Sequence, residues 1–180
     1  MSTVPTPPRA ARAPAAKTHA ANASDRFLCV RLEPELYALP ILAVHEIQAY
    51  APPTPVPGMP EHVRGVLNVQ GAIVPVVDLR RRLGLPTQAA PPRRPIVFVR
   101  VEDRIAGLVV DAASGVVDLP PELRRPPPEV GAAVDGGPVA ALARHPSGLI
   151  VVLDVERLLL RDAALVGAAA LVSSTAEAQP

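Results

Sequence analysis

Tryptophan is absent from the sequence, and Phe27, Tyr37, Tyr50 and Phe98 are its only aromatic side chains. Because 49% of the 180 residues are nevertheless hydrophobic, the core must be filled mainly by Val, Leu, Ile and Ala. Single-stranded nucleic acid is bound on basic surfaces interleaved with aromatic rings, and this chain has too few rings to supply one. The formal net charge is only +1, which indicates neither nucleic acid nor an anionic membrane as a partner.

Cysteine occurs once, at Cys29, so an intrachain disulfide is excluded. The residue lies inside the apolar run FLCVRL, where a buried and inert thiol is expected. The N-terminus lacks the apolar segment of a secretory signal, and the longest apolar run, Ala163–Val172, has about half the length of a membrane span. These absences predict a cytoplasmic protein that does not insert into the membrane.

The residue types that bind metals or cofactors are not arranged for either task. The four histidines have neither ligand spacing nor a nearby cysteine. The eleven glycines are dispersed and form no phosphate-binding loop, and a Gly-x-Ser-x-Gly elbow is absent. The sequence therefore predicts no metal site and no cofactor.

Four aspartates follow apolar runs, namely Asp78, Asp111, Asp118 and Asp154. An enzyme could be built on a pair of them, because strand ends do carry active sites. A helix N-cap explains Asp78 and Asp154 without catalysis, since a capping carboxylate accepts hydrogen bonds from the free amides of the first helical turn. We therefore favour an architectural role, with the enzyme as the weaker alternative.

Short apolar runs separated by turn residues predict a mainly β protein. Gln70-Gly71 joins two of these runs into a hairpin, because glycine adopts the backbone conformation of a tight turn. Long helices between strands are missing, which favours small barrels over parallel βαβ units. The expected strands are Phe27–Leu32, Tyr37–Leu39, Val44–Tyr50, Val63–Val69, Ala72–Val77, Ile96–Val101, Ile105–Val110, Gly115–Leu119, Val139–Ala143 and Leu149–Leu153.

A short amphipathic helix is expected after Asp78 and ends at Gly84. Leu79 and Leu83 are four residues apart and are predicted to face the core. The three arginines at 80–82 are predicted to point outward, either as a solvated helix face or as a contact for an acidic partner.

The same pattern of apolar strand, aspartate and amphipathic helix occurs in Val74–Leu83 and again in Ile150–Leu159. Its two aspartates, Asp78 and Asp154, are 76 residues apart, and the second helix is expected to run toward Ala170. This internal repeat predicts two similar β-subdomains. We expect a disordered Pro/Ala-rich tail over 1–25, one domain of two intertwined β-subdomains over 26–170, and a disordered C-terminal tail over 171–180.

From Phe27 to about Leu160 the chain resembles the CheW family of bacterial chemotaxis coupling proteins. The segments that carry the resemblance are FLCVRL with YAL, VHEIQAY, TPVPGMPEHVRGVLNVQGAIVPVVDLRRRLGL, IVFV, RIAGLVVD and VVLDVERLL. The resemblance implies two SH3-like five-stranded β-barrel subdomains with short helices and a C-terminal helix. It also implies a non-enzymatic scaffold that couples chemoreceptors to a CheA-type histidine kinase.

The resemblance places the family's partner contacts on particular residues of this chain. The receptor-facing positions fall on Val44, Glu46, Gly65 and Gln70, and the kinase-facing edge falls on Ala106, Gly107 and Leu108. The implied partners are the cytoplasmic tip of a methyl-accepting chemoreceptor and the regulatory domain of the kinase. Such a protein is cytoplasmic and is recruited to membrane-associated receptor arrays.

Gln70 departs from the family pattern, because an arginine is expected there in an Asn-Leu-Arg-Gly turn. A neutral amide cannot replace a guanidinium that pairs with an acidic receptor residue. Loss of the arginine is therefore expected to weaken that contact by roughly 1–3 kcal/mol. The alternative function is therefore a CheW-like adaptor for polar localisation, or for assembly of a pilus or motility array, that does not couple the signal.

Overall fold

The computed structural model of the protein describes residues 22–86, 94–128 and 137–160. The predicted tails lie almost entirely outside these ranges, as does the end of the predicted domain at residue 170. The division of the chain into 1–25, 26–170 and 171–180 therefore stays a prediction.

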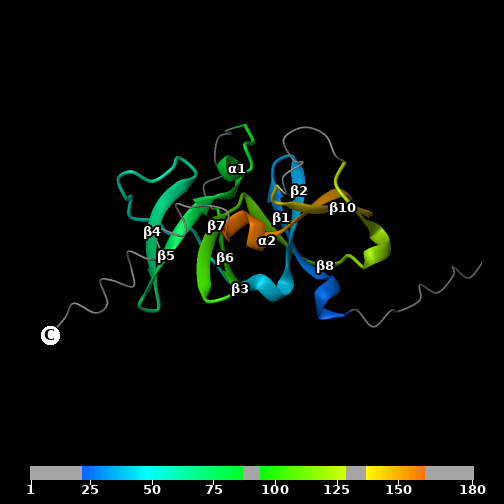
Figure 1. Ribbon diagram of the computed structural model, residues 1–180, viewed down its shortest axis with the longest axis horizontal. Coiled ribbons are helices and arrows are strands. Elements are labelled where there is room, and N and C mark those ends of the chain that lie inside the picture. The colour runs from blue at the N-terminus through cyan, green and yellow to red at the C-terminus, as the bar shows by residue number, and fades with distance from the viewer. Residues whose placement is uncertain (1–21, 87–93, 129–136, 161–180) are drawn as a thin grey trace, which may run out of the picture.

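Eleven strands form two mixed sheets within the described residues (Figure 1). Sheet A has the strand order β8-β1-β2-β11-β10-β9, and sheet B has the order β3-β6-β7-β5-β4. The strands of sheet A are, in that order, Ala112–Asp118, Arg26–Leu32, Glu35–Pro40, Gly148–Leu153, Val139–His145 and Arg124–Arg125. Those of sheet B are Val44–Gln48, Ile96–Val101, Arg104–Val109, Ala72–Asp78 and Val63–Val69.

The prediction of a mainly β fold with two β-subdomains is confirmed, but sheet A has one strand more than expected. The additional strand is β9, in which Arg124 and Arg125 pair with Ala143 and Leu142 of β10. The sequence indicated a loop there, because two residues in a proline-rich segment carry no recognisable strand pattern. Each sheet retains two edge strands, β8 and β9 in sheet A and β3 and β4 in sheet B.

The two sheets repeat one topology. In each sheet an edge strand is followed by a hairpin, and the second strand of that hairpin pairs in parallel with a strand of a second hairpin. The registers correspond as well, since Val76 lies opposite Gly107 in sheet B and Val152 lies opposite Ala38 in sheet A. The subdomains interlock, because β3 follows β2 along the chain but joins sheet B, and β8 follows β7 but joins sheet A.

Both predicted helix caps are confirmed. Asp78 Oδ1 accepts a hydrogen bond of 3.2 Å from the Arg81 amide at the start of α1 (Leu79–Arg82), and Asp154 Oδ1 accepts one of 2.9 Å from the Arg157 amide in α2 (Val155–Leu160). The predicted continuation of α2 toward Ala170 lies outside the described residues. The 3-10 helices are η1 (Ala23–Asp25), η2 (Ile41–Ala43) and η3 (Pro121–Leu123).

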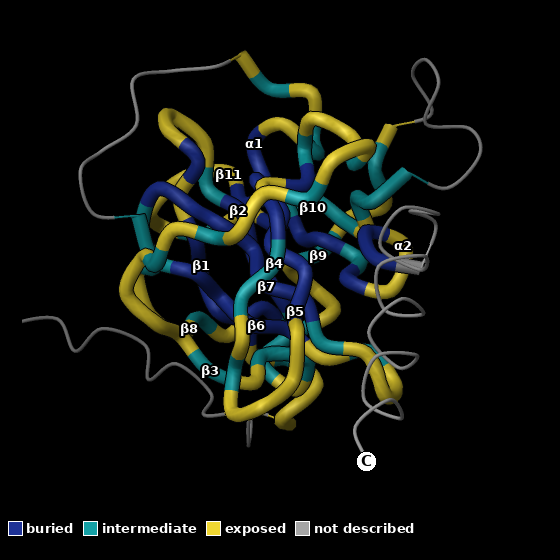
Figure 2. Tube along the Cα trace, turned by 90° about the vertical axis from the view of Figure 1, so that its left-hand side faces the viewer, coloured by how far each residue is buried: buried dark blue, intermediate teal, exposed yellow. Residues whose placement is uncertain are grey.

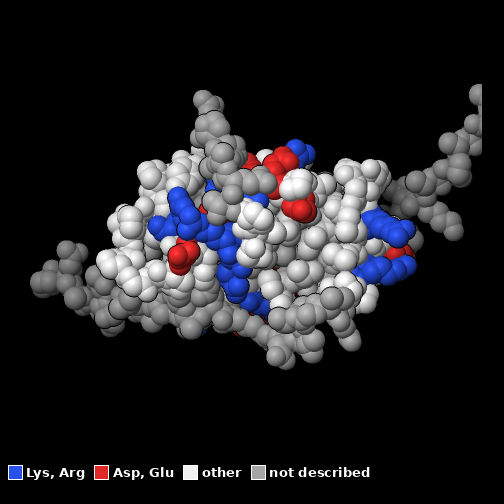
Figure 3. Space-filling view, turned by 90° about the horizontal axis from the view of Figure 1, so that it is seen from above, with Lys and Arg blue, Asp and Glu red and all other residues white. Residues whose placement is uncertain are grey.

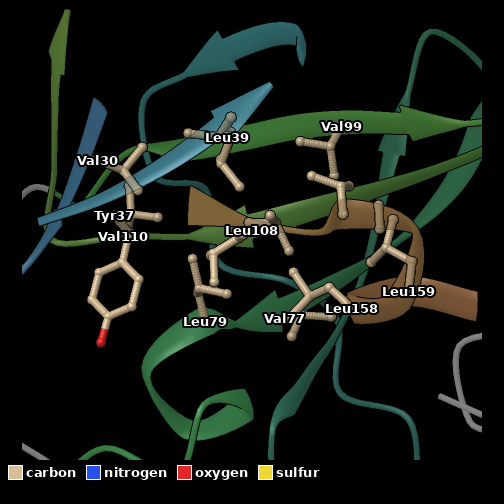
Figure 4. Close-up of a cluster of buried hydrophobic side chains, with 14 of the residues drawn as sticks. Val30, Tyr37, Leu39, Val77, Leu79, Val99, Leu108, Val110, Leu158 and Leu159 are labelled. Atoms are coloured by element: carbon tan, nitrogen blue, oxygen red, sulfur yellow. The ribbon is translucent and has the colours of Figure 1, made fainter. Parts of the chain in front are cut away.

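Aliphatic side chains from both sheets and both α-helices form one shared core (Figure 4). Val77 and Leu79 of the first strand-helix corner are fully buried there, together with Leu158 of the second. Smaller clusters lie within sheet A and within sheet B. Figure 2 shows the buried residues at the centre and the exposed ones mainly at turns and connections. No helix in the described ranges is long and apolar enough to cross a membrane.

Arg80 corrects the prediction that all three arginines of α1 point outward. Its side chain is only 4% exposed, and its Nη2 lies 2.6 Å from Asp111 Oδ2. The same nitrogen donates a hydrogen bond of 2.7 Å to the Glu33 carbonyl in the β1–β2 turn, and Nη1 donates one of 3.2 Å to the Pro86 carbonyl. Arg80 therefore binds sheet A to the corner of sheet B.

Arg94 completes a buried network of two arginines and two aspartates. Its guanidinium lies 3.2 Å from Asp111 Oδ1 and 3.5 Å from Asp78 Oδ2. Asp111 Oδ2 also accepts a hydrogen bond of 3.0 Å from the Glu33 amide. The opposite charges balance, and each buried carboxylate has several donors, which is the condition under which buried charges are tolerated.

The other two arginines of α1 have different surroundings. Arg81 is exposed, as predicted, and donates to the Glu61 carbonyl at 3.3 Å. Arg82 is half-buried and donates a hydrogen bond of 3.2 Å to the Leu158 carbonyl in α2, so it joins the two helices. Leu79 lies in the core as predicted, and Leu83 packs against it.

We expect Arg80→Met to lower the free energy of unfolding by about 3–5 kcal/mol, because Asp111 would keep its buried charge while losing its closest partner. Urea unfolding followed by circular dichroism measures the change. Arg81→Met is the matched control on the same helix and should stay within about 0.5 kcal/mol of the wild type. Equal losses for the two variants would contradict the role given to the Arg80–Asp111 pair.

Candidate functional site

Val44 and Glu46, two of the predicted receptor-facing residues, lie on edge strand β3. The register shifts between them, since Val44 lies opposite Val99 and Glu46 lies opposite Phe98 of β6. Val44 is half-buried and packs against the shared core, whereas Glu46 Oε1 accepts a hydrogen bond of 2.8 Å from Gln48 Nε2. Glu46 is therefore a polar group at a sheet edge, and Val44 also has a structural role.

Gly65 lies in a bulge of β4, where the register against β5 shifts after Val63. Its φ is +137°, and a Cβ atom on it would lie 2.1 Å from the Thr54 carbonyl oxygen. Thr54 approaches this closely because its backbone exchanges hydrogen bonds of 2.8 and 2.9 Å with Val66. A bulge that meets another backbone requires glycine, which gives Gly65 a structural role independent of any partner.

Gln70 and Gly71 form the turn of the predicted β4–β5 hairpin, which is confirmed. Both residues have positive φ, +52° and +89°, as in the two-residue turns that suit twisted hairpins. Asn68 Oδ1 accepts a hydrogen bond of 2.9 Å from the Gly71 amide and stabilises the turn. Gln70 is exposed at this tip.

The strand order does not join the four predicted receptor-facing residues into one surface. Gly65 and Gln70 belong to the β4 edge of sheet B, whereas Val44 and Glu46 belong to its β3 edge, and three strands lie between these edges in the order of the sheet. The grouping of these residues as a receptor site stays a prediction.

Ala106, Gly107 and Leu108 lie on β7, which is not an edge. β7 pairs with β6 on one side and with β5 on the other, and all three residues are buried. Gly107 leaves room for its neighbours, since a Cβ atom there would lie 2.9 Å from Ile96 Cγ2. The prediction that these residues form an edge is therefore wrong, because β7 lies inside sheet B, and their part in kinase binding stays a prediction.

A groove of about 880 Å³ lies where η2, β6, β9 and α2 meet, and we call it the η2–α2 groove. Leu42 of η2 is the most exposed large apolar side chain among the described residues, at 71%. Apolar side chains provide most of the lining, including Phe27, Val101 and Val155. Its charged lining residues are Arg100, Arg124, Arg125, Asp154 and Glu156.

Two of these charges are already neutralised by neighbours. The Arg124 guanidinium lies 2.8 Å from Asp25 and stacks over the Phe27 ring, and Asp154 lies 3.2 Å from Arg157. Within the described residues, Arg100, Arg125 and Glu156 have no ion-pair partner, and Arg125 donates only to the backbone carbonyls of Glu122 and Arg124. The groove therefore combines an apolar surface with unpaired charges, as a protein-docking surface does.

No group of three or more possible metal ligands occurs among the described residues. Burial raises the pKa of the Cys29 thiol above its ordinary value, so this thiol stays protonated at neutral pH. Burial, followed by the Glu35 charge, raises the pKa of the Tyr37 hydroxyl, and the nearby Arg80 partly opposes the rise. Neither group is activated as a nucleophile.

Basic and acidic side chains are mixed on the face that carries α1. Figure 3 shows a band of arginines across the middle of this face and acidic groups beside it. The exposed Arg81 belongs to α1, and contact between it and an acidic partner stays a prediction.

Neither the exposure of Leu42 nor the η2–α2 groove was predicted from the sequence. Leu42 lies in the 3-10 helix Ile41–Ala43, and three residues are too few to show a hydrophobic periodicity. The groove brings together residues from 24 to 156, which only the interlocked sheets place side by side.

Comparison with known proteins shows one consistent similarity. The family model described as "CheW-like domain" matches residues 26–163. The chain is 33% identical to "Chemotaxis protein CheW" of Rhizobium meliloti, over 64% of this chain and 74% of that protein. It is 30% identical to the protein of the same name from Klebsiella aerogenes, over 75% and 81% of the two chains. The crystal structure of scaffolding protein TtCheW from Thermoanaerobacter tengcongensis superposes with a TM-score of 0.69 at 30% identity, covering 76% of this chain and 92% of that one.

We expect Gly65→Ala to destabilise the protein by about 1–3 kcal/mol, since the new methyl group would strain the backbone and displace Thr54. Thermal unfolding measures this loss. Gly71→Ala is the control, because its φ is also positive but no atom lies within 4 Å of the added Cβ. If Gly65→Ala were no more destabilising than Gly71→Ala, the close approach of Thr54 would not explain the glycine.

Proposed function

Because the chain belongs to the CheW-like domain family, we propose that it is a non-enzymatic scaffold that couples chemoreceptors to a CheA-type histidine kinase. Family membership over residues 26–163 is the observation that carries this proposal. The relatives reported above are named as chemotaxis and scaffolding proteins, which favours coupling over the adaptor that does not transmit a signal.

The architecture supports a role in bridging two partners. Two β-subdomains of the same topology interlock around one core, so surfaces on either subdomain are held at a fixed relative position. The buried carboxylates Asp78 and Asp111 are paired with Arg80 and Arg94, which gives them a structural role.

The receptor contact is proposed at the η2–α2 groove and the adjoining edge strand β3. Leu42 offers an exposed apolar side chain in the groove, and β3 begins two residues later. Glu46 adds a carboxylate at the free edge. Gln70 lies at the β4–β5 hairpin tip and does not line this groove.

We propose that sheet B contacts the kinase and that the partner there is the regulatory domain of the kinase. Ala106, Gly107 and Leu108 would act from inside the sheet, because their small or aliphatic side chains determine how closely β6 and β5 pack around β7. A scaffold of this kind would be cytoplasmic and recruited to receptor arrays at the membrane.

Reconstitution of the full-length chain with the kinase and a receptor cytoplasmic fragment tests the function. We expect receptor-dependent stimulation of kinase autophosphorylation that requires this protein. The kinase and receptor without the scaffold provide the baseline. Co-sedimentation without stimulation would instead show an adaptor, and the absence of any complex would reject both functions.

We predict that Gln70→Arg strengthens binding to a receptor fragment with a standard tip by about 1 kcal/mol, because an exposed guanidinium can pair with an acidic residue. Isothermal titration calorimetry measures the affinity. Gln70→Leu is the control, since it removes the amide without adding charge. An unchanged affinity for Gln70→Arg would show that the missing arginine does not weaken this contact.

A further inference from the structure

Another hollow lies where sheet A meets both α-helices, and we call it the α1–α2 pocket. Its volume is about 530 Å³, and it shares no lining residue with the η2–α2 groove. Pockets of this size enclose small molecules. The lining is mainly apolar and includes Leu83 next to α1, Val139 of β10 and the prolines at 127, 128 and 138.

Three neighbouring strands of sheet A form the floor of the α1–α2 pocket. Val151 of β11 lies opposite Tyr37 of β2 on one side and opposite Leu142 of β10 on the other. Because opposite residues share one face of a sheet, these three side chains form a row, and all three line the pocket. The next residues, Ala38 and Val152, pack in the separate cluster of sheet A. Strand register therefore determines the floor.

Tyr37 brings a single polar group to this floor. The residue is only 6% exposed, and its ring packs within the shared core. Figure 4 shows its hydroxyl directed away from the aliphatic side chains of that core. Buried polar groups normally have a hydrogen-bond partner, but none contacts this hydroxyl within the described residues. Burial raises the pKa of Tyr37, so the hydroxyl stays protonated at neutral pH and can donate to a ligand.

The internal repeat shows that the fold does not require this tyrosine. The corresponding registers of the two sheets place Gly107 and Ala38 at equivalent positions. The residues that precede them, Ala106 and Tyr37, are therefore equivalent as well. In sheet B the alanine is buried and carries no polar group, so the architecture of this position needs neither a ring nor a hydroxyl.

Both charged residues of the lining are arginines. Arg82 is held at the pocket by its hydrogen bond of 3.2 Å to the Leu158 carbonyl of α2. Arg157 is exposed at the rim, and its Nε lies 3.2 Å from Asp154 Oδ2. A guanidinium has five N–H donors, so this contact leaves Arg157 able to bind a further group. The pocket thus combines a positive rim, a neutral donor and an apolar wall.

We propose that the α1–α2 pocket binds a small organic acid, with its carboxylate on the arginines and the Tyr37 hydroxyl and its apolar chain on the floor. Arginine forks match the geometry of a carboxylate. A phosphate ester fits less well, because its second charge needs more cation than Asp154 leaves at Arg157. The bound acid would lie between α1 and sheet A and stabilise their contact. This function is additional to the coupling proposed above.

Octanoate is the probe for this site, and its binding to the full-length chain is measured by titration calorimetry. Octanol and octylamine keep the same apolar chain with a neutral or positive head group, and acetate keeps the carboxylate without the chain. N-acetyl-leucyl-leucine carries the carboxylate at the end of a peptide, which distinguishes a free acid from a protein C-terminus. A ligand that binds only the folded state also raises the melting temperature.

Two variants test the residues of the pocket. Tyr37→Phe removes only the hydroxyl, and Arg157→Gln removes the charge at the rim. Arg81→Gln is the matched control, because Arg81 donates its amide to the capping Asp78 as Arg157 does to Asp154, but it does not line the pocket.

We expect one octanoate per chain with a dissociation constant of about 1 mM or below, about tenfold tighter than the other probes. Tyr37→Phe and Arg157→Gln should each weaken binding by about fivefold and Arg81→Gln by less than about twofold. Without ligand, Tyr37→Phe should melt close to the wild type, because its hydroxyl has no partner to lose.

An absence of octanoate binding, or unchanged affinity in the two pocket variants, would overturn the inference. Equal affinity for octanol would show apolar adsorption only, and tighter binding of the peptide would replace the small acid with a protein C-terminus, so either result would overturn it too. No receptor or kinase enters these measurements, so their failure would leave the proposed function intact.

Discussion

Arg80 and Asp111 bring opposite charges together at the place where α1, the β1–β2 turn and the β7–β8 connection meet. Burial makes this contact conditional, because either charge alone would be costly without its partner. Arg94 and the Glu33 amide contact the oxygens of Asp111, and the Glu33 carbonyl accepts a hydrogen bond from Arg80, so the position of each segment depends on the others. The relative orientation of the two sheets is therefore determined by polar geometry as well as by the aliphatic core between them.

The two subdomains share a topology but not a surface. Equivalent positions hold the pocket-lining Tyr37 in one subdomain and the buried Ala106 in the other. A repeated fold would otherwise present the same surface twice, and a scaffold that did so would not distinguish its partners. Differences at a few equivalent positions are sufficient to make the surfaces different, while the shared core and the two capped corners remain the same.

Local patterns allowed most strands, the β4–β5 hairpin and both aspartate caps to be predicted, because each depends on residues close in the sequence. Arg80 was assigned to the wrong face because three consecutive arginines suggest a solvated helix surface, and its partner Asp111 is 31 residues away. The kinase-facing residues were placed on an edge by the family resemblance, and local sequence patterns contain no strand order that would have corrected this placement. Leu42 was missed because its exposure depends on how the two sheets are interlocked.

Sheet A is assembled from the two ends of the domain, since the parallel pairing of β2 with β11 joins residues more than 110 positions apart. Sheet B, by contrast, is built from strands between Val44 and Val109. During synthesis, sheet B can form before β8 and β11, the remaining partners of β1 and β2, have been made. Long-range pairing of this kind slows folding and leaves strand edges open in the nascent chain. Sheet A is therefore complete only after the last hairpin, β10–β11, has formed and β11 has paired with β2.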